Sequence, residues 1–338
     1  MQRTRVRPLV LLLLCLPAAA AAKDSLSDIP PRAIEQSQIT LAGSPPFHLK
    51  AKVFEGTNPH NDAYKAEIEE DWAAPHKWRR TVTANGFSQT LVVNGDQTQE
   101  EIKGDYYPNW LRTIVDAILD PGARVTGVEL DKSSDNPMIG GTKLCRRFSF
   151  RAGIAPVGNN VFSSFCFEDG LIDSVLEPGY DAEYQDYKKF AGKKVARTIR
   201  EYIKPGEEVE ARIEELTEVN SLDESRFAVQ NSGPILQTVT VSEEVLRSIA
   251  TDAPAMQWPA IRGGKAVGVL SIYVCLDRDG GVRETYALNS DHPVMSDAAQ
   301  QQIRTWKFKP AAVHGTRVQI EGILTFAYEA KIDAKLGQ

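Results

Sequence analysis

Short runs in which apolar and polar residues alternate recur through the first two thirds of the chain, and they predict a sheet of antiparallel strands. The first expected strands lie at 47–55, 64–72, 78–83 and 87–93. Between the last two stands Asn85-Gly86, the pair that a tight hairpin with positive φ favours. Further runs lie at 123–130, 143–150, 161–168 and 170–176. Over 184–217 the pattern fits either a continued helix or strands, and the alternation at 196–203 and 209–216 favours strands.

One segment of this region has helical spacing instead. Its apolar residues recur on one side of a helix and are Trp110, Leu111, Ile114, Val115, Ile118 and Leu119. Asp120-Pro121-Gly122 ends the helix. Because an apolar helix face needs an apolar surface to cover, we expect this helix to pack on the predicted sheet.

The last third of the chain follows the order strand, hairpin, strand, helix, strand. The expected elements are a strand at 269–276, a hairpin turn at 277–281, a strand at 282–289, a helix opened by Ser296-Asp297, and a strand at 317–328. Pro310 stops the helix. Asn231-Ser232-Gly233-Pro234 indicates a linker, which we assign to 231–240.

This order resembles the C-terminal domain of TonB-family energy transducers. The motifs that carry the resemblance are Asp-x-x-Gly-Gly-Val at 277–282, Asn289-Ser290, His292-Pro293, Trp306-Lys307-Phe308-Lys309-Pro310 and Gly315-Thr316-Arg317-Val318. They span roughly 235–330, and we assign the domain to 241–331. Trp306, Phe308 and Pro310 are also explained as a helix end with two buried aromatic rings, so this motif is mostly structural. The resemblance implies a three-stranded antiparallel sheet with helices.

Residues 40–230 resemble the lipoprotein-carrier and lipoprotein-sorting proteins of the LolA type. The motifs are Pro75 with Lys77-Trp78-Arg79, the turn at 93–96, and Tyr187-Lys188-Lys189-Phe190. The resemblance implies a curved antiparallel half-barrel that is covered by a helix and encloses an apolar cavity. An unrelated β-rich domain with a packed core is the alternative. The fold class expected for the whole chain is α+β.

Composition and charge narrow the class of protein. A length of 338 residues indicates two domains, and 42% apolar with 25% charged residues is typical of a globular protein. The formal net charge of −6 argues against nucleic-acid binding, which calls for a concentrated basic surface.

Residues 1–22 have the pattern of a cleavable export signal. Arg3, Arg5 and Arg7 precede a short apolar core at 9–16, and small residues follow at 18–22. The core is far shorter than the roughly 20 residues that span a bilayer. We therefore expect a periplasmic protein, with a retained inner-membrane anchor as the alternative.

Export makes disulfide bonds possible for the three cysteines beyond the signal. Cys145 and Cys166 lie in two runs that are expected to pair as neighbouring strands, so they can face each other. Whether they are joined stays open, because the sequence does not give the Cβ geometry. Cys275 is expected to be a buried strand residue.

The sequence offers no catalytic or metal-binding pattern. The five histidines are scattered, and no Gly-x-Ser-x-Gly elbow, phosphate loop or dinucleotide fingerprint is present. We therefore expect no enzyme, no metal and no cofactor.

The TonB-type resemblance implies binding of an envelope partner by strand addition at the edge of the last strand. The expected partner is an envelope protein or an outer-membrane receptor segment, and the residues at the edge are Arg317, Gln319, Ile320 and Glu321. A covered edge, or one that pairs in a homodimer, is the alternative.

The LolA-type resemblance implies the second hypothesis, a carrier of lipid or acylated protein. The expected cavity lining is Trp78, Phe87, Leu91, Trp110, Ile114 and Ile118. The third hypothesis, a membrane-anchored energy transducer, requires an uncleaved signal. It is disfavoured, because the long Pro-rich spacer of such proteins is absent from the sequence. The main expectation is an envelope binding protein that takes part in transport.

Overall fold

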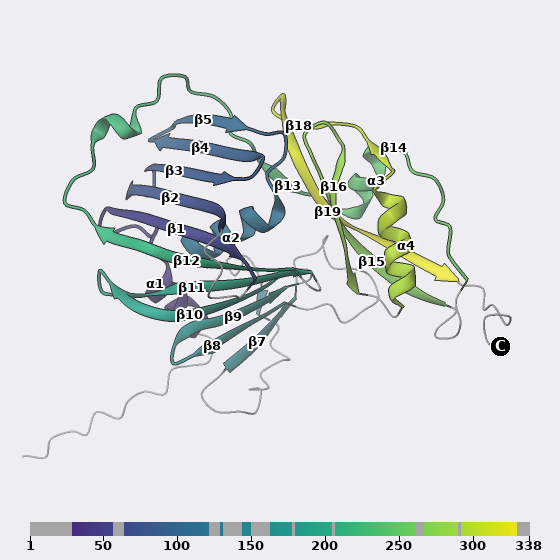
Figure 1. Cartoon of the computed structure of the whole chain (residues 1–338), viewed down its shortest axis with the longest axis horizontal. Coiled ribbons are helices and arrows are strands. Elements are labelled where there is room, and N and C mark those ends of the chain that lie inside the picture. Colours follow the sequence, from purple (N-terminus) through teal and green to yellow (C-terminus); the bar gives the residue numbers. More distant parts are fainter. Residues whose placement is uncertain are drawn as a thin grey trace, which may run out of the picture.

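The structure is a computed structural model. It describes residues 29–56, 64–121, 129–130, 144–149, 163–177, 180–204, 207–260, 267–289 and 292–329. These residues form a large curved sheet and a smaller sheet beside it (Figure 1). The predicted export signal at 1–22 lies outside the described residues.

The large sheet has twelve strands, all paired with antiparallel neighbours, in the order β5-β4-β3-β2-β1-β12-β11-β10-β9-β8-β7-β6. The strands are β1 (Phe47–Glu55), β2 (Tyr64–Ala74), β3 (Lys77–Ala84), β4 (Phe87–Asn94), β5 (Gln97–Lys103), β6 (Glu129–Leu130), β7 (Leu144–Ser149), β8 (Ser163–Glu168), β9 (Leu171–Glu177), β10 (Tyr180–Phe190), β11 (Lys193–Lys204) and β12 (Glu207–Glu218). Strand β1 pairs with β12, and β5 and β6 are the two edge strands of the sheet. They do not pair with each other in the described part of the chain, so the sheet does not close on itself. The predicted antiparallel, curved and open sheet is confirmed. Most of the strand expected at 123–130 lies outside the described residues.

Two helices pack on the inner face of this sheet. They are α1 (Ile29–Ser37) and α2 (Asn109–Leu119), and one apolar cluster holds both against the strands. The apolar spacing that predicts a helix over 110–119 is confirmed by α2. Asn85-Gly86 forms the turn between β3 and β4, with Gly86 at a φ of 75°.

The smaller sheet follows the short 3-10 helix η3 (Glu224–Phe227). Its elements are β13 (Thr238–Thr240), α3 (Glu243–Ile249), β14 (Ala250–Asp252), β15 (Val267–Leu276), β16 (Val282–Asn289), α4 (Pro293–Ile303), β17 (Lys307–Phe308), β18 (Ala311–Val313) and β19 (Thr316–Glu329). The strand order is β13-β19-β15-β16, β18 also pairs with β19, and β14 pairs with β17. The three expected strands are present, and β13 adds a parallel strand that the alternation pattern did not predict.

Local contacts explain where the β15–β16 hairpin turns and where helix α4 begins. The Asp277 carboxylate accepts hydrogen bonds from the backbone N–H groups of Asp279 and Gly281, at 2.9 and 2.8 Å. Helix α4 begins at Pro293, earlier than the expected start at Ser296-Asp297. The reason is that proline suits the first helical turn, where its missing N–H is not needed. Trp306 and Phe308 are buried after the helix, as the motif predicted.

Candidate functional site

The inner face of the large sheet is the first candidate site, because its side chains are apolar across many strands. Leu49, Ala51 and Val53 of β1 alternate inward, each with an exposed fraction of 0%. One continuous cluster joins them to inward side chains of β2–β4 and β8–β12. Many of these are alanines, among them Ala66 and Ala211. Small side chains leave space above the sheet for another apolar body.

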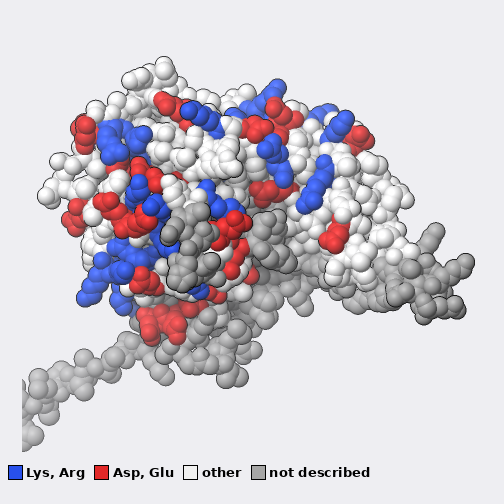
Figure 2. Space-filling model, viewed as in Figure 1, with Lys and Arg blue, Asp and Glu red and all other residues white. Residues whose placement is uncertain are grey.

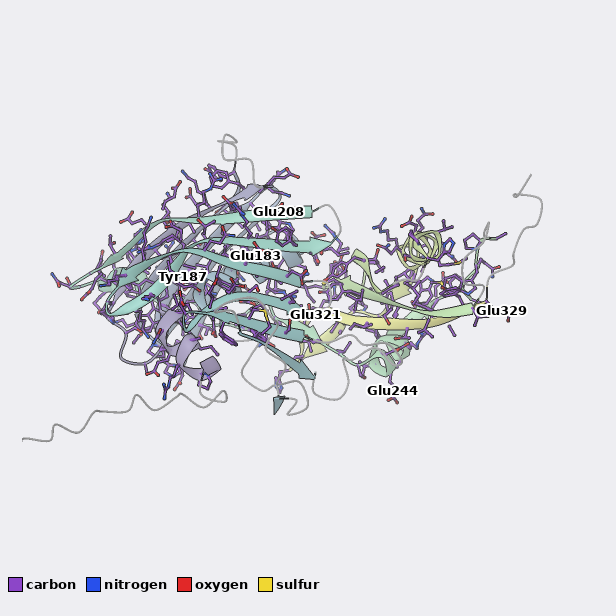
Figure 3. The ribbon with its side chains drawn as sticks, turned by 90° about the horizontal axis from the view of Figure 1, so that it is seen from below. Glu183, Tyr187, Glu208, Glu244, Glu321 and Glu329 are labelled. Atoms are coloured by element: carbon purple, nitrogen blue, oxygen red, sulfur yellow. A yellow bond between two sulfur atoms is a disulfide. The ribbon has the colours of Figure 1, made fainter. Side chains whose placement is uncertain are left out.

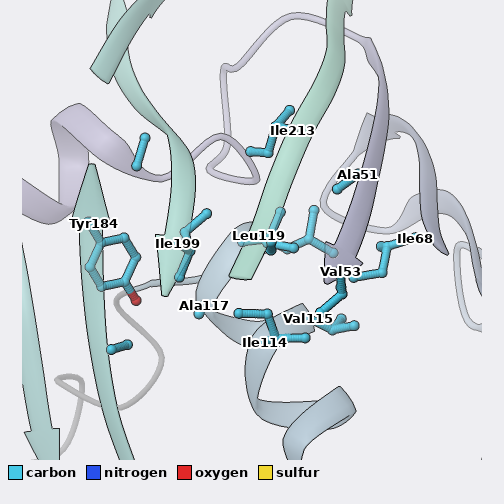
Figure 4. Packing of buried hydrophobic residues seen from close by; sticks show 14 of the residues in the cluster. Ala51, Val53, Ile68, Ile114, Val115, Ala117, Leu119, Tyr184, Ile199 and Ile213 are labelled. Atoms are coloured by element: carbon cyan, nitrogen blue, oxygen red, sulfur yellow. The ribbon is translucent and has the colours of Figure 1, made fainter. Parts of the chain in front are cut away.

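Helix α2 fills that space. Eight of its residues are buried, and six of these are apolar, Asn109 and Thr113 being the polar ones. Around it lie Ala51, Val53, Ile68, Tyr184, Ile199 and Ile213 of the sheet, facing Ile114, Val115, Ala117 and Leu119 of the helix (Figure 4). Helices α1 and α2 cover much of the inner face, and Tyr286 of the small sheet also belongs to this apolar cluster.

Of the six side chains expected to line a cavity, three belong to α2 and three come from β3 and β4. Trp78, Phe87, Trp110, Ile114 and Ile118 all contact the apolar cluster, and Leu91 is buried. Phe87 stacks on Tyr107, with 4.5 Å between the ring centroids. All of the six except Leu91 belong to or pack against one apolar cluster, which is a packed interior in this structure.

The inner face also carries a charged pair. Glu70 of β2 and Arg80 of β3 lie directly opposite each other, and Arg80 Nε donates to Glu70 Oε2 at 2.7 Å. The side chain of Glu70 is 1% exposed. Burial raises the pKa of Glu70, and the Arg80 charge opposes that shift. The guanidinium also lies 4.8 Å from the ring centroid of Trp78.

The N-terminus of α2 is anchored by the other domain. Pro108 stands at its N-cap and provides no side-chain cap. Glu284 of β16 takes that role, because its Oε1 accepts from the Asn109 backbone N–H at 2.9 Å and from the Tyr106 hydroxyl at 2.7 Å. A carboxylate at this end is favoured by the helix dipole. Burial raises the pKa of Tyr106, so its hydroxyl remains a donor.

A second group of polar contacts lies beside it, at the end of α2 nearest β19. Arg112 of α2 forms an ion pair with Glu321 of β19, and the Tyr273 hydroxyl donates to the same carboxylate at 2.6 Å. Figure 3 shows Glu321 between the two sheets. Burial raises the pKa of the neighbouring Cys275 thiol to about 12, which keeps it protonated and unreactive.

The edge of the last strand is covered in this structure, which is the alternative that the sequence left open. Gln319 is 0% exposed, and its side chain bonds both the N–H and the C=O of Tyr107, at 2.5 and 3.2 Å. Strand β13 pairs in parallel with residues 319–321. Ile320 is 4% exposed, and Arg317 forms an exposed ion pair with Asp279. The edge is covered because the linker that precedes the small domain folds back along it.

The two cysteines left open by the sequence are joined. Cys145 of β7 and Cys166 of β8 are cross-strand partners, and a disulfide bond connects them. It links two strands near the β6 end of the sheet. Cys275 is buried in β15, as expected.

Other site classes gain no support from the described residues. They contain no cluster of three or more metal-ligating side chains. Among these residues, too, no helix is both long and apolar enough to cross a membrane. On the face drawn in Figure 2, basic and acidic side chains are interspersed.

Comparisons with known proteins give slight likenesses. No family model and no curated protein matches the chain. One similar solved structure is a LolA superfamily protein from Nitrosomonas europaea, at 11% identity and a TM-score of 0.35, covering 60% of this chain and 97% of that one. Another is a domain assigned as an outer membrane lipoprotein-sorting protein from Vibrio parahaemolyticus, at 9% identity and a TM-score of 0.32, covering 59% and 94%.

Both structures belong to the group that residues 40–230 resemble in sequence. Likenesses this slight carry no argument about function, which has to come from the residues themselves. The TonB-type resemblance of 241–331 stays a prediction.

Sequence reasoning missed the residues that join the two domains. Glu284 and Arg112 stand in ordinary strand and helix patterns, and Tyr106 lies in the loop before α2. The one available signal was Tyr106-Tyr107-Pro108, two tyrosines that precede the helix and need polar partners if they are buried.

Proposed function

We propose that the chain is an exported carrier that holds the acyl chain of a lipid or lipidated protein against the inner face of the large sheet. The observation that carries this proposal is an open, curved sheet whose apolar inner face is covered mainly by short helices. A ligand chain would take the space that α2 occupies, with α2 displaced as a lid. The proposal includes a periplasmic location after cleavage of the leader at 1–22.

The energies of such an exchange are close to balance. Burying ten methylene groups of an acyl chain contributes about 8 kcal/mol. Withdrawing the five large apolar side chains that α2 buries costs about 8–15 kcal/mol. Because the two terms are similar, loading and release can both be reversible, which a carrier requires.

An Ile118→Ala variant tests the lid. Ile118 is 3% exposed, and its truncation should cost the closed state about 2–4 kcal/mol. The loaded state, with α2 displaced, should lose less. We therefore expect a fluorescent fatty acid to bind more tightly, with the dissociation constant lowered about tenfold or more.

The matched control for this experiment is Ile303→Ala in α4. Ile303 is 0% exposed and belongs to the core of the small domain, so its loss should lower stability without changing fatty-acid affinity. The carrier proposal fails if wild-type protein binds no fatty acid and native mass spectrometry of protein from the envelope detects no lipid. N-terminal sequencing of that protein distinguishes a cleaved leader from a retained inner-membrane anchor.

A second candidate function, partner binding by the small domain, is favoured by strand β13. This strand has three residues, and its flanks bond β19 through Gln319 N–H to Gln237 C=O at 3.0 Å and Val241 N–H to Glu321 C=O at 2.9 Å. The outer edge of β19 thus accepts an added parallel strand from this chain. We infer that an extended segment of an envelope partner can take its place.

A Val241→Pro variant tests this exchange. Proline removes the Val241 N–H, so β13 should bind less well and leave the edge more accessible. We expect stronger cross-linking of an envelope protein to Thr325, with Val241→Ala unchanged from wild type because it keeps the N–H. Equal cross-linking in all three proteins would argue that the edge serves only the fold.

A further inference from the structure

A pocket opens where the two domains meet, beside the N-terminal end of α2. Its volume is about 260 Å³. The large-sheet domain contributes Lys65 of β2 and Trp110 of α2, and the small domain contributes residues of β16 together with Arg304, which follows α4. The pocket therefore exists only when the two domains are docked.

Three basic side chains line this pocket, and their charges are only partly neutralised. Arg283 lies 3.0 Å from the exposed Asp105 and 3.5 Å from Asp277, whose side chain is 10% exposed, so its charge is the most neutralised of the three. Lys65 lies 3.6 Å from Glu55, which is 72% exposed. Pairs this exposed contribute little. Arg304 donates through Nε to the Thr285 hydroxyl at 3.0 Å, and it has no carboxylate within ion-pair distance among the described residues.

The one acidic side chain of the lining does not cancel these charges. Glu284 directs its Oε1 at the Tyr106 hydroxyl and the Asn109 N–H, both of which donate to it. Its charge is therefore used to cap α2. The lining as a whole has three basic side chains and one carboxylate, which is already hydrogen-bonded at the start of α2. It therefore favours an anionic ligand.

Part of the remaining wall is apolar and belongs to, or packs against, the cluster inside the large sheet. Trp110 is half-buried against the apolar cluster, and Ile203 at the end of β11 is 3% exposed and belongs to that cluster. Tyr286 is buried on the opposite side and contributes to the same cluster. The pocket is therefore complementary to a ligand with an anionic end, which the basic side chains can bind, and an apolar chain, which the apolar side chains can contact.

We infer that this pocket binds the anionic head group, phosphate or carboxylate, of an amphiphile whose chain runs under α2. The inference rests on the proposed carrier function and adds the class of ligand. Arg304 can bind two oxygens of such a group through its planar fork, and Lys65 supplies a point charge. Since the two residues come from different domains, a bound head group bridges them.

The test uses the full chain and three probes, in titrations that follow tryptophan fluorescence. Dodecyl phosphate carries a charged head, dodecyl maltoside an uncharged one, and inorganic phosphate is the head alone. In the double variant Lys65→Gln/Arg304→Gln, we expect the dissociation constant for dodecyl phosphate to rise about 10–100-fold, since each charge-assisted contact accounts for roughly tenfold. Binding of dodecyl maltoside should not change.

The control is Lys188→Gln/Lys309→Gln, which removes two exposed charges at other places on the chain and should change no affinity more than about twofold. If wild-type protein binds both detergents equally and the double variant changes neither, the head-group site is refuted while the carrier function stands. If inorganic phosphate binds as tightly as dodecyl phosphate, the pocket is a plain anion site and the amphiphile is refuted. If no amphiphile binds at all, the carrier function and this inference fail together.

Discussion

An Arg80→Met variant is expected to lose about 3–5 kcal/mol of stability at neutral pH, the typical cost of leaving one partner of a buried ion pair alone. The methionine can fill the volume of the side chain but leaves the Glu70 carboxylate, 1% exposed, with no opposite charge. Denaturant unfolding at pH 7 measures the loss. The double variant Glu70→Gln/Arg80→Met should recover most of it, because no buried charge remains.

This loss should depend on pH in a defined direction. Burial already raises the pKa of Glu70, and removal of Arg80 takes away the charge that opposes the shift. The native state then binds a proton more tightly than the unfolded state, so stability falls as pH rises from the unfolded pKa of about 4.3 through the folded pKa. The difference in free energy of unfolding between the wild type and Arg80→Met should therefore become smaller toward acidic pH.

Lys50→Met on the outer face of the same sheet is the control. Lys50 pairs with Glu67 and Glu69 at 3.2 and 3.3 Å, but all three side chains are partly exposed. Its loss should cost no more than about 1 kcal/mol. If Lys50→Met and Arg80→Met lose equal stability, the buried pair on the inner face stabilises the fold no more than an exposed pair does.

A Gln319→Leu variant is expected to loosen the junction between the domains, at a cost of about 2–6 kcal/mol. The leucine leaves both the N–H and the C=O of Tyr107 without their partner, and each buried group that loses its hydrogen bond costs about 1–3 kcal/mol. We expect the two domains to unfold in separate steps, with faster proteolysis of the connecting segment 219–237.

The control for the junction is Gln301→Leu, an exposed position on α4, which should leave unfolding unchanged. A single unfolding step at the wild-type midpoint in Gln319→Leu would show that the two hydrogen bonds do not hold the domains together. Because the proposed head-group pocket needs docked domains, Gln319→Leu should also weaken dodecyl phosphate binding.

Local chemistry made much of the fold predictable. Alternation with a period of two marked β1–β4, and Asn85-Gly86 fixed the turn between the last two of them. Apolar residues at helical spacing marked α2, and the Asp277 hairpin followed from side chain and glycine placement. Each of these signals is contained within about ten residues, so tertiary contacts were not needed to find it.

Several strands were not predicted, and β5 and β13 show why: their sequences lack that signal. Strand β5 has one large apolar residue, Ile102, among polar ones, as an edge strand often does. Strand β13 has three residues and is stabilised by pairing with β19, which lies about 80 positions further along the chain. Neither strand can be identified without its partner.

The sequence by itself determined an open antiparallel sheet, a covering helix and a smaller domain with a buried Trp306 and Phe308. Only the tertiary structure decided that Gln319 and Glu321 face the chain's own large domain, and that Glu284 caps α2. It also decided that Lys65 and Arg304 line one pocket. The physical reason is that burial of polar groups requires partners, and those partners come from segments more than 170 residues apart, a distance over which local patterns carry no information.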